Sequence, residues 1–161
     1  MPDITACGLC GSGDLKVILD MGDQPLAERF DDPRTYPLKL AECGRCTLVQ
    51  LTHIVDQRDL FPPAHPYATG NTQFLRDHFA ALAAELGEGL RPGDLVVDIG
   101  CNDGTLLAAF RDDVRRVGVE PTDQGEKCAA RGIHTWINFF TADLARGILD
   151  MYGPAKVITA W

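Results

Sequence analysis

The sequence predicts an α/β protein in which a small cysteine-rich β module precedes about four strands of a doubly wound parallel sheet. Two observations predict this arrangement. Cysteines recur in two Cys-x-x-Cys pairs before residue 50, among short strand and turn patterns. From residue 91 onward, short apolar runs alternate with segments of helical periodicity, as in repeated βα units. We therefore expect domains at residues 1–60 and 91–161, joined by a connector and an amphipathic helix at residues 61–90.

Composition and charge narrow the class of protein. The chain has 161 residues, of which 45% are hydrophobic, enough for packed cores in one small and one partial domain. No apolar run approaches the roughly 20 residues of a membrane span. The start of the chain lacks the basic and apolar segments of a secretory signal. A net charge of -8 opposes binding to nucleic acid or anionic membrane, so we expect neither as a partner. The missing signal makes the cytoplasm the expected location.

Four of the six cysteines form the two pairs, Cys7 with Cys10 and Cys43 with Cys46. Two intervening residues let a tight turn aim both thiolates at one ion, while backbone N–H groups can donate to the sulfurs. Two such turns make a closed tetrahedral site, which is typical of structural zinc and leaves no open position for a substrate. In a reducing compartment this interpretation is favoured over two alternatives, disulfides or a redox-active pair.

The residues between the pairs predict short strands. Residues 11–42 form a longer insert than compact zinc ribbons use. A strand is expected at residues 15–20, closed by a turn at 21–23, and further strands lead into and out of the second pair at 36–40 and 48–51. Too few residues lie here for an independent apolar core, so the ion is expected to stabilise this zinc-ribbon-like module.

The second part is predicted from its apolar periodicity. After a proline-rich connector at residues 61–70, apolar residues recur at helical spacing up to Gly87, namely Leu75, Phe79, Leu82 and Leu86. Buried parallel strands and their helices should then alternate. Strands are expected at residues 94–99, 116–120, 135–139 and 156–161, and helices at residues 105–111, 123–131 and 142–151.

A turn containing two glycines follows the first of these strands, with the sequence Asp98-Ile99-Gly100-Cys101-Asn102-Asp103-Gly104. Such a turn lets backbone amides approach a ligand at the N-terminus of the next helix. The dinucleotide pattern G-x-G-x-x-G is not met, because Asn102 and Leu107 stand where its second and third glycines would fall. The turn instead matches the looser acidic-x-G-x-x-x-G pattern of class I S-adenosylmethionine (SAM) methyltransferases.

Glu120 ends the second predicted strand. A carboxylate at this place can accept hydrogen bonds from both ribose hydroxyls of a nucleotide. Together with the glycine turn it predicts a ligand of nucleotide type. The alternative is an α/β domain with a glycine-rich connection and no ligand.

In order along nearly the whole chain, these residues resemble the SAM-dependent sugar C-methyltransferases of deoxysugar biosynthesis, which act on nucleotide-linked 4-keto sugars. The matching segments are Cys7-x-x-Cys10, residues 22–27 with Phe30, and residues 36–38, 43–51, 61–78, 98–104, 118–121 and 138–140.

The resemblance implies a role for each matched position. It makes Cys7, Cys10, Cys43 and Cys46 ligands of a structural zinc ion. It places Glu120 on the ribose of SAM and residues 138–140 near the adenine. Tyr67 corresponds to a catalytic tyrosine that reaches the active site from the connector. The full set of implied cofactor-binding residues is Asp98, Gly100, Asn102, Gly104, Glu120, Pro121, Asn138, Phe139 and Phe140.

The chain departs from the family beside Tyr67. Where the family has Tyr-x-Tyr and a serine-rich turn, this sequence has His65-Pro66-Tyr67 and a turn of different composition. In the implied reaction, a base removes the proton next to the 4-keto group and the enolate attacks the methyl group of SAM. The main base is expected beyond Trp161, so the 161-residue chain is expected to be a truncated, inactive form.

The fourth predicted strand would then be an exposed edge open to self-association. Two rival functions remain at this point. One is a non-enzymatic zinc-ribbon and α/β binding module. The other is a nicotinamide-dependent oxidoreductase, which the missing third glycine disfavours.

Overall fold

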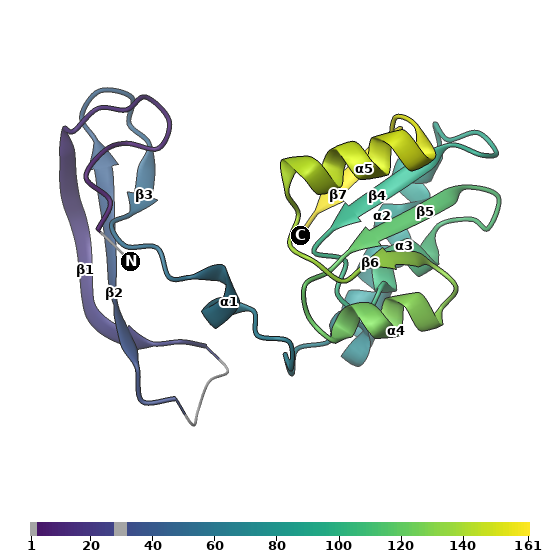
Figure 1. Ribbon diagram of the computed structural model, residues 1–161, viewed down its shortest axis with the longest axis horizontal. Coiled ribbons are helices and arrows are strands. Elements are labelled where there is room, and N and C mark those ends of the chain that lie inside the picture. Colours follow the sequence, from purple (N-terminus) through teal and green to yellow (C-terminus); the bar gives the residue numbers. More distant parts are fainter. Residues whose placement is uncertain (1–2, 28–31) are drawn as a thin grey trace. The chain divides into compact units, whose positions relative to one another are not determined.

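The computed structural model describes residues 3–27 and 32–161, which fall into two compact units at residues 1–60 and 61–161 (Figure 1). The predicted connector and amphipathic helix lie within the second unit. Phe30, one of the matching positions, lies outside the described residues. In the described ranges, no helix combines the length and the apolar character that crossing a membrane requires.

The first unit is built on a three-stranded antiparallel sheet in the order β1-β2-β3. Its elements are β1 (Leu15–Pro25), β2 (Thr35–Cys43), β3 (Val49–Leu51) and a short helix, α1 (Gln57–Leu60). The predicted strands around the second cysteine pair are thus present. In the second pair Cys43 ends β2 and Cys46 lies between β2 and β3, whereas the first pair precedes β1.

Strand β1 is longer than predicted, because residues 21–23 continue the strand as an irregularity and do not end it. The carboxylate of Asp20 accepts a hydrogen bond of 2.9 Å from the backbone N–H of Gly22, whose φ is +69°. This local turn shifts the pairing register between Asp20 and Asp23, as a bulge does, and pairing with β2 then resumes.

The sheet of the first unit buries little apolar surface. Among its described residues, the buried apolar side chains are those of Cys7, Ala41 and Cys43. Val17 and Met21 of β1 remain about half exposed. The stability of this unit therefore depends on the cysteine cluster, as expected for a small metal-binding module.

The second unit contains a parallel four-stranded sheet in the order β6-β5-β4-β7. Its strands are β4 (Leu95–Ile99), β5 (Arg115–Val119), β6 (His134–Trp136) and β7 (Val157–Ala160). Its helices are η1 (Thr69–Asn71), α2 (Gln73–Gly87), α3 (Thr105–Ala109), α4 (Gln124–Ala130) and α5 (Ala142–Tyr152). The chain runs outward from β4 to β6 and then crosses back to β7. This confirms the predicted α/β class and its four strands.

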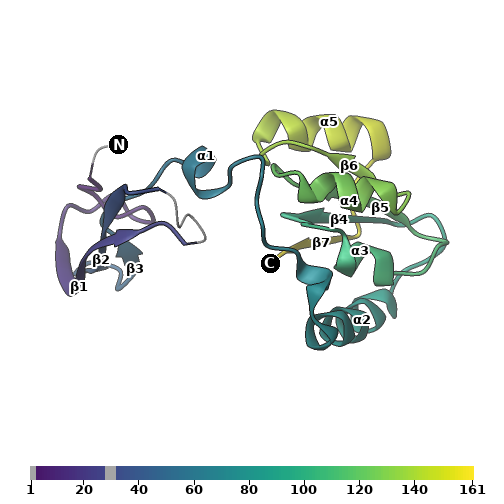
Figure 2. The same cartoon turned by 90° about the horizontal axis from the view of Figure 1, so that it is seen from below.

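Helices cover both faces of this sheet (Figure 2). On one face Val96 packs with Phe79 of α2 and Leu107 of α3. On the other face Val97 packs with Ile148 of α5. Successive residues of β4 thus enter opposite cores, which explains why residues 95–97 are all apolar.

Strand β6 is shorter than predicted and ends at Trp136. The backbone N–H of Asn138 donates to the carbonyl of Trp136 at 3.0 Å, and the side-chain oxygen of Asn138 accepts from the N–H of Phe139 at 2.8 Å. These bonds direct the backbone away from its pairing with β5. The residues after Trp136 are thereby free to line a cavity rather than to extend the sheet.

Candidate metal and cofactor sites

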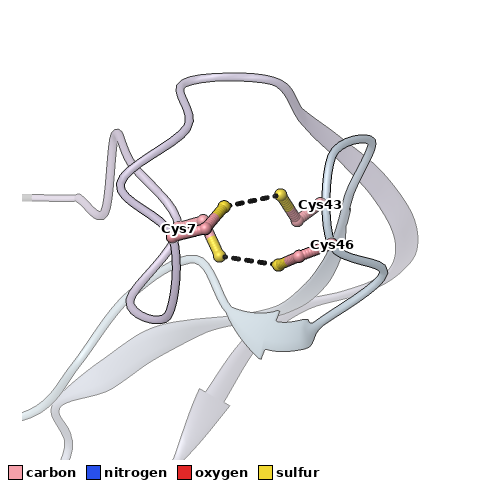
Figure 3. A group of neighbouring side chains, drawn as sticks. Cys7, Cys43 and Cys46 are labelled. Carbon is pink, nitrogen blue, oxygen red and sulfur yellow. Dashed lines mark hydrogen bonds between the residues drawn. The ribbon is translucent and has the colours of Figure 1, made fainter.

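The four paired cysteines converge at one end of the first unit (Figure 3). The sulfurs of Cys7 and Cys46 lie 3.5 Å apart, those of Cys10 and Cys43 lie 3.7 Å apart, and all four lie within 4.8 Å of one another. Tetrahedral zinc with bonds of about 2.3 Å places sulfurs about 3.8 Å apart. The cysteines are free thiols, separated by far more than the roughly 2 Å of a disulfide.

The two Cys-x-x-Cys turns, which we call knuckles, have the same backbone geometry. In the first, the N–H of Gly11 donates to the carbonyl of Cys7 at 2.9 Å, and in the second the N–H of Thr47 donates to the carbonyl of Cys43 at 2.9 Å. Gly11 and Thr47 have φ values of +70° and +62°. This left-handed conformation is easy for glycine and costly for a β-branched residue.

Backbone N–H groups favour the thiolate form of the first cysteine in each knuckle. The N–H of Cys10 is the largest influence on Cys7 and lowers the pKa of that thiol to about 6. The N–H of Cys46 likewise lowers the pKa of Cys43. At Cys10 and Cys46 a backbone N–H also lowers the pKa, but burial and the neighbouring cysteines outweigh it and the pKa of both thiols is raised, so binding of a cation must remove their protons. Thiolates are the species that bind zinc. The four cysteines therefore form a closed site that fits a structural Zn²⁺ ion.

A cavity of about 360 Å³ lies in the second unit where β4, β5 and β6 end. Its volume is in the range of small-molecule sites. Of the predicted residues, its lining includes Tyr67, Gly100, Asn102, Glu120, Pro121, Asn138, Phe139 and Phe140. Sequence reasoning did not single out the other lining residues, which are Phe61, His65, Thr69, Ile99, Val119, Thr122 and Trp161. Asp98 and Gly104 lie outside this lining.

Glu120 is buried at the edge of the cavity and holds the loops around it. One of its carboxylate oxygens accepts from the backbone N–H of Asn102 at 3.0 Å. The other accepts from the N–H and hydroxyl of Thr122 at 2.9 and 2.7 Å. Each oxygen has two lone pairs, so three of the four are used and one, on the oxygen that Asn102 contacts, remains for a hydroxyl group of a ligand.

Asp98 lies in β4, just before the glycine turn, and lines a smaller cavity of about 180 Å³. Burial raises the pKa of its carboxyl group to about 6, against the opposing effect of a hydrogen bond from the Thr159 hydroxyl at 2.7 Å. The charge of Glu120 raises this pKa further. Asp98 thus joins β4 to β7 through its side chain.

Gly104 begins α3 with a φ of +75°. A Cβ atom at this position would lie 2.5 Å from the sulfur of Cys128. The structure therefore gives Gly104 a packing role between α3 and α4.

Tyr67 lines both cavities and remains 46% exposed. Its carbonyl accepts from the side-chain amide of Asn102 at 3.1 Å. The predicted catalytic tyrosine is therefore beside the predicted cofactor residues. Nearby, the rings of Phe61 and His65 stack with their centroids 5.9 Å apart.

Comparison with known proteins defines the class of this chain. Residues 7–61 match the Methyltransf_13 family model, described as a putative zinc binding domain. Residues 76–152 match the model described as methionine biosynthesis protein MetW. The chain thus carries a Methyltransf_13 zinc-binding domain followed by a methyltransferase-like domain.

The similarity to one relative extends over both parts. The chain is similar to the C-methyltransferase NovU of Streptomyces niveus, with 32% identity over 166 residues. The similarity covers 96% of this chain and 39% of NovU, so the chain spans well under half the length of that relative. These similarities confirm the predicted resemblance to C-methyltransferases with an N-terminal zinc-binding module. Together with the cysteine cluster, they support Zn²⁺ and SAM as cofactors.

Proposed function

We propose that this chain is the zinc-binding and cofactor-binding part of a SAM-dependent methyltransferase that methylates a carbon atom of a nucleotide-linked 4-keto deoxysugar. The observation that supports it best is the cavity of the second unit. The glycine turn after β4, the acid that follows β5 and the aromatic residues after β6 all line this one space. These are the places where parallel α/β sheets bind nucleotides.

Each part of the cavity suits one part of SAM. Glu120 can accept a hydrogen bond from a ribose hydroxyl, and Phe139 and Phe140 offer apolar surface for the adenine. The turn at Gly100 leaves room for the methionine part. SAM, when bound, supplies the methyl group, while these residues hold it in a fixed orientation.

The acceptor substrate is proposed on two grounds. NovU is named a C-methyltransferase, which supports transfer to carbon. The family resemblance supports the 4-keto sugar and the enolate reaction. Tyr67, beside the cofactor cavity, is the residue we assign to the acceptor side.

The free thiols suit the reducing cytoplasm, where we place the protein.

The rival functions have less support. A dinucleotide site needs a glycine where this chain has Leu107, and that side chain is fully buried in the core. A pure binding module would not require an acid and a glycine turn to meet in a cavity.

In strand β7, which pairs with β4 at the edge of the sheet, the side chain of Ile158 is 63% exposed. We propose weak self-association through this strand.

Isothermal titration of the 161-residue chain tests the proposal. The demethylated product, S-adenosylhomocysteine, should bind with one site per chain, whereas NADH should not. Binding of NADH alone would support the oxidoreductase, and binding of neither would support the non-enzymatic module. Transfer of labelled methyl from SAM to a nucleotide-linked 4-keto sugar, measured with a chain that spans the full length of NovU, tests the reaction.

A further inference from the structure

Residues 63–70, which end in the first residues of η1, lie against the loops that follow β4 and β5, and we call this segment the strap. Asn102, in the loop after β4, holds it at two points. Its side-chain oxygen accepts from the backbone N–H of Thr69 at 2.8 Å, and its side-chain NH₂ donates to the carbonyl of Tyr67 at 3.1 Å. The next residue, Asp103, accepts from the N–H of Gly70 at 3.0 Å.

The loop after β5 and the start of α4 hold the other half of the strap. The backbone N–H of Asp123 donates to the carbonyl of Pro63 at 2.8 Å. The side-chain NH₂ of Gln124 donates to the carbonyl of His65 at 2.7 Å. The side-chain oxygen of Gln124 accepts from Lys127 at 2.8 Å, so the amide is fixed at both ends.

The bonded residues alternate along the strap. Pro63, His65, Tyr67 and Thr69 each use a backbone group to reach the sheet's loops. His65, Tyr67 and Thr69 are also among the residues that line the cofactor cavity. One wall of the cavity is therefore made by a segment that the two amide side chains hold in place.

We propose that Asn102 and Gln124 are positioning residues, whose side-chain amides dock the strap and thereby complete the cofactor cavity. The effect on cofactor binding rests on the proposed function. Both the oxygen and the NH₂ group of the Asn102 side chain form hydrogen bonds with the strap. We therefore assign this side chain to the strap and not to the cofactor. Its positive φ of +50°, which asparagine tolerates better than most residues, aims the side chain there. Gln124 is 4% exposed, and a buried amide needs its partners.

Hydrogen exchange tests the docking without any ligand. Asn102→Gly keeps a backbone suited to positive φ and removes the amide. The backbone amides of Thr69 and Gly70 should then exchange about tenfold faster or more, while those of β4 keep their protection. Gln124→Glu should loosen the strap around His65, because a carboxylate cannot donate to a carbonyl. Glu126→Gln, an exposed change on the same helix, is the matched control and should alter neither.

A third variant disturbs the strap from its own side. A Cβ atom at Gly70 would lie 2.5 Å from a carboxylate oxygen of Asp103 and 2.7 Å from the hydroxyl of Thr105. Gly70→Ala should therefore push the strap away and reproduce the effect of Asn102→Gly. Combining the two changes should add little, since both act through the same docking. Melting followed by tryptophan fluorescence checks that each variant is folded.

Titration with S-adenosylhomocysteine links docking to the cavity. Asn102→Gly and Gln124→Glu should each weaken binding about fivefold or more, and Glu126→Gln should not. Unchanged exchange at Thr69 in folded Asn102→Gly would overturn the docking role. Faster exchange with undiminished affinity would overturn the claim that the strap completes the cavity. Failure of the unaltered chain to bind S-adenosylhomocysteine would instead contradict the proposed function, while the exchange data would still decide the docking.

Discussion

At the scale of single residues, Asp98 shows how burial sets the chemistry of a side chain. The pKa of its carboxyl group is raised to about 6, above the ordinary 3.8, mainly by burial. The folded state therefore binds the proton more tightly than the unfolded state. Stability from this group is present at low pH and falls as pH rises from about 4 to about 6, after which it is constant.

The variant Asp98→Asn removes this titration. We expect it to flatten the pH dependence and to raise the free energy of unfolding at pH 7 by about 1–3 kcal/mol. Urea unfolding between pH 4.5 and 7.5 measures this. Both tryptophans, Trp136 and Trp161, lie in the second unit, so their fluorescence follows that unit alone. The exposed Asp143→Asn is the control, and an unchanged pH slope in Asp98→Asn would contradict the assignment.

Glu120 carries the clearest prediction for the cofactor. The variant Glu120→Gln preserves the shape of the side chain and removes its charge. It should weaken binding of S-adenosylhomocysteine by about 1–3 kcal/mol, because hydrogen bonds to a charged acceptor are the stronger ones. Calorimetric titration beside the control Glu126→Gln gives the difference. Equal affinity in both variants would remove Glu120 from the binding site.

At the scale of elements, the two knuckles share one backbone geometry but not one residue at the left-handed position. Thr47 has the φ of +62° that glycine occupies at residue 11. Thr47→Gly should relieve about 1 kcal/mol of backbone strain. Because folding of such a module is coupled to the metal, the gain should appear as about fivefold tighter zinc retention. Competition with a chromophoric chelator measures it, and Gly11→Thr should act in the opposite direction.

Most elements were predictable because their signals are local. The core strand β4 begins with a short apolar run, and α2 shows its stripe at Leu75 and Phe79. The bulge in β1 and the early end of β6 were not predicted. Each depends on one side chain that bonds the backbone close by, from Asp20 and Asn138 respectively.

The candidate sites likewise contain some features that the sequence predicted and one that it did not. The cysteine pairs predicted the metal cluster, since two ligands within one turn specify much of its geometry. The glycine turn and Glu120 predicted a ligand of nucleotide type, and both line one cavity. The role of Asn102 was not predictable, because its partners at Tyr67 and Thr69 are more than 30 residues away in the sequence. Such a contact exists only once the strap is folded against the sheet.

At the scale of the whole molecule, the two units have different sources of stability. The first has few buried apolar residues and a four-thiolate cluster, as far as its residues are described. The second has two apolar cores, one on each face of its sheet. Every residue that lines the cofactor cavity also belongs to the second unit. Loss of the metal should therefore affect the two units unequally.

Removal of zinc tests this division. A chelator at neutral pH should unfold the first unit, seen as a loss of β signal in circular dichroism, because binding and folding of such modules are coupled. Tryptophan fluorescence should not change, and the affinity for S-adenosylhomocysteine should stay within about twofold, since the apolar cores do not need the ion. Cys7→Ser should reproduce this pattern without a chelator, and chelator saturated with zinc is the control. If S-adenosylhomocysteine binding disappears together with the metal, the cavity depends on the first unit and the two units are not independent.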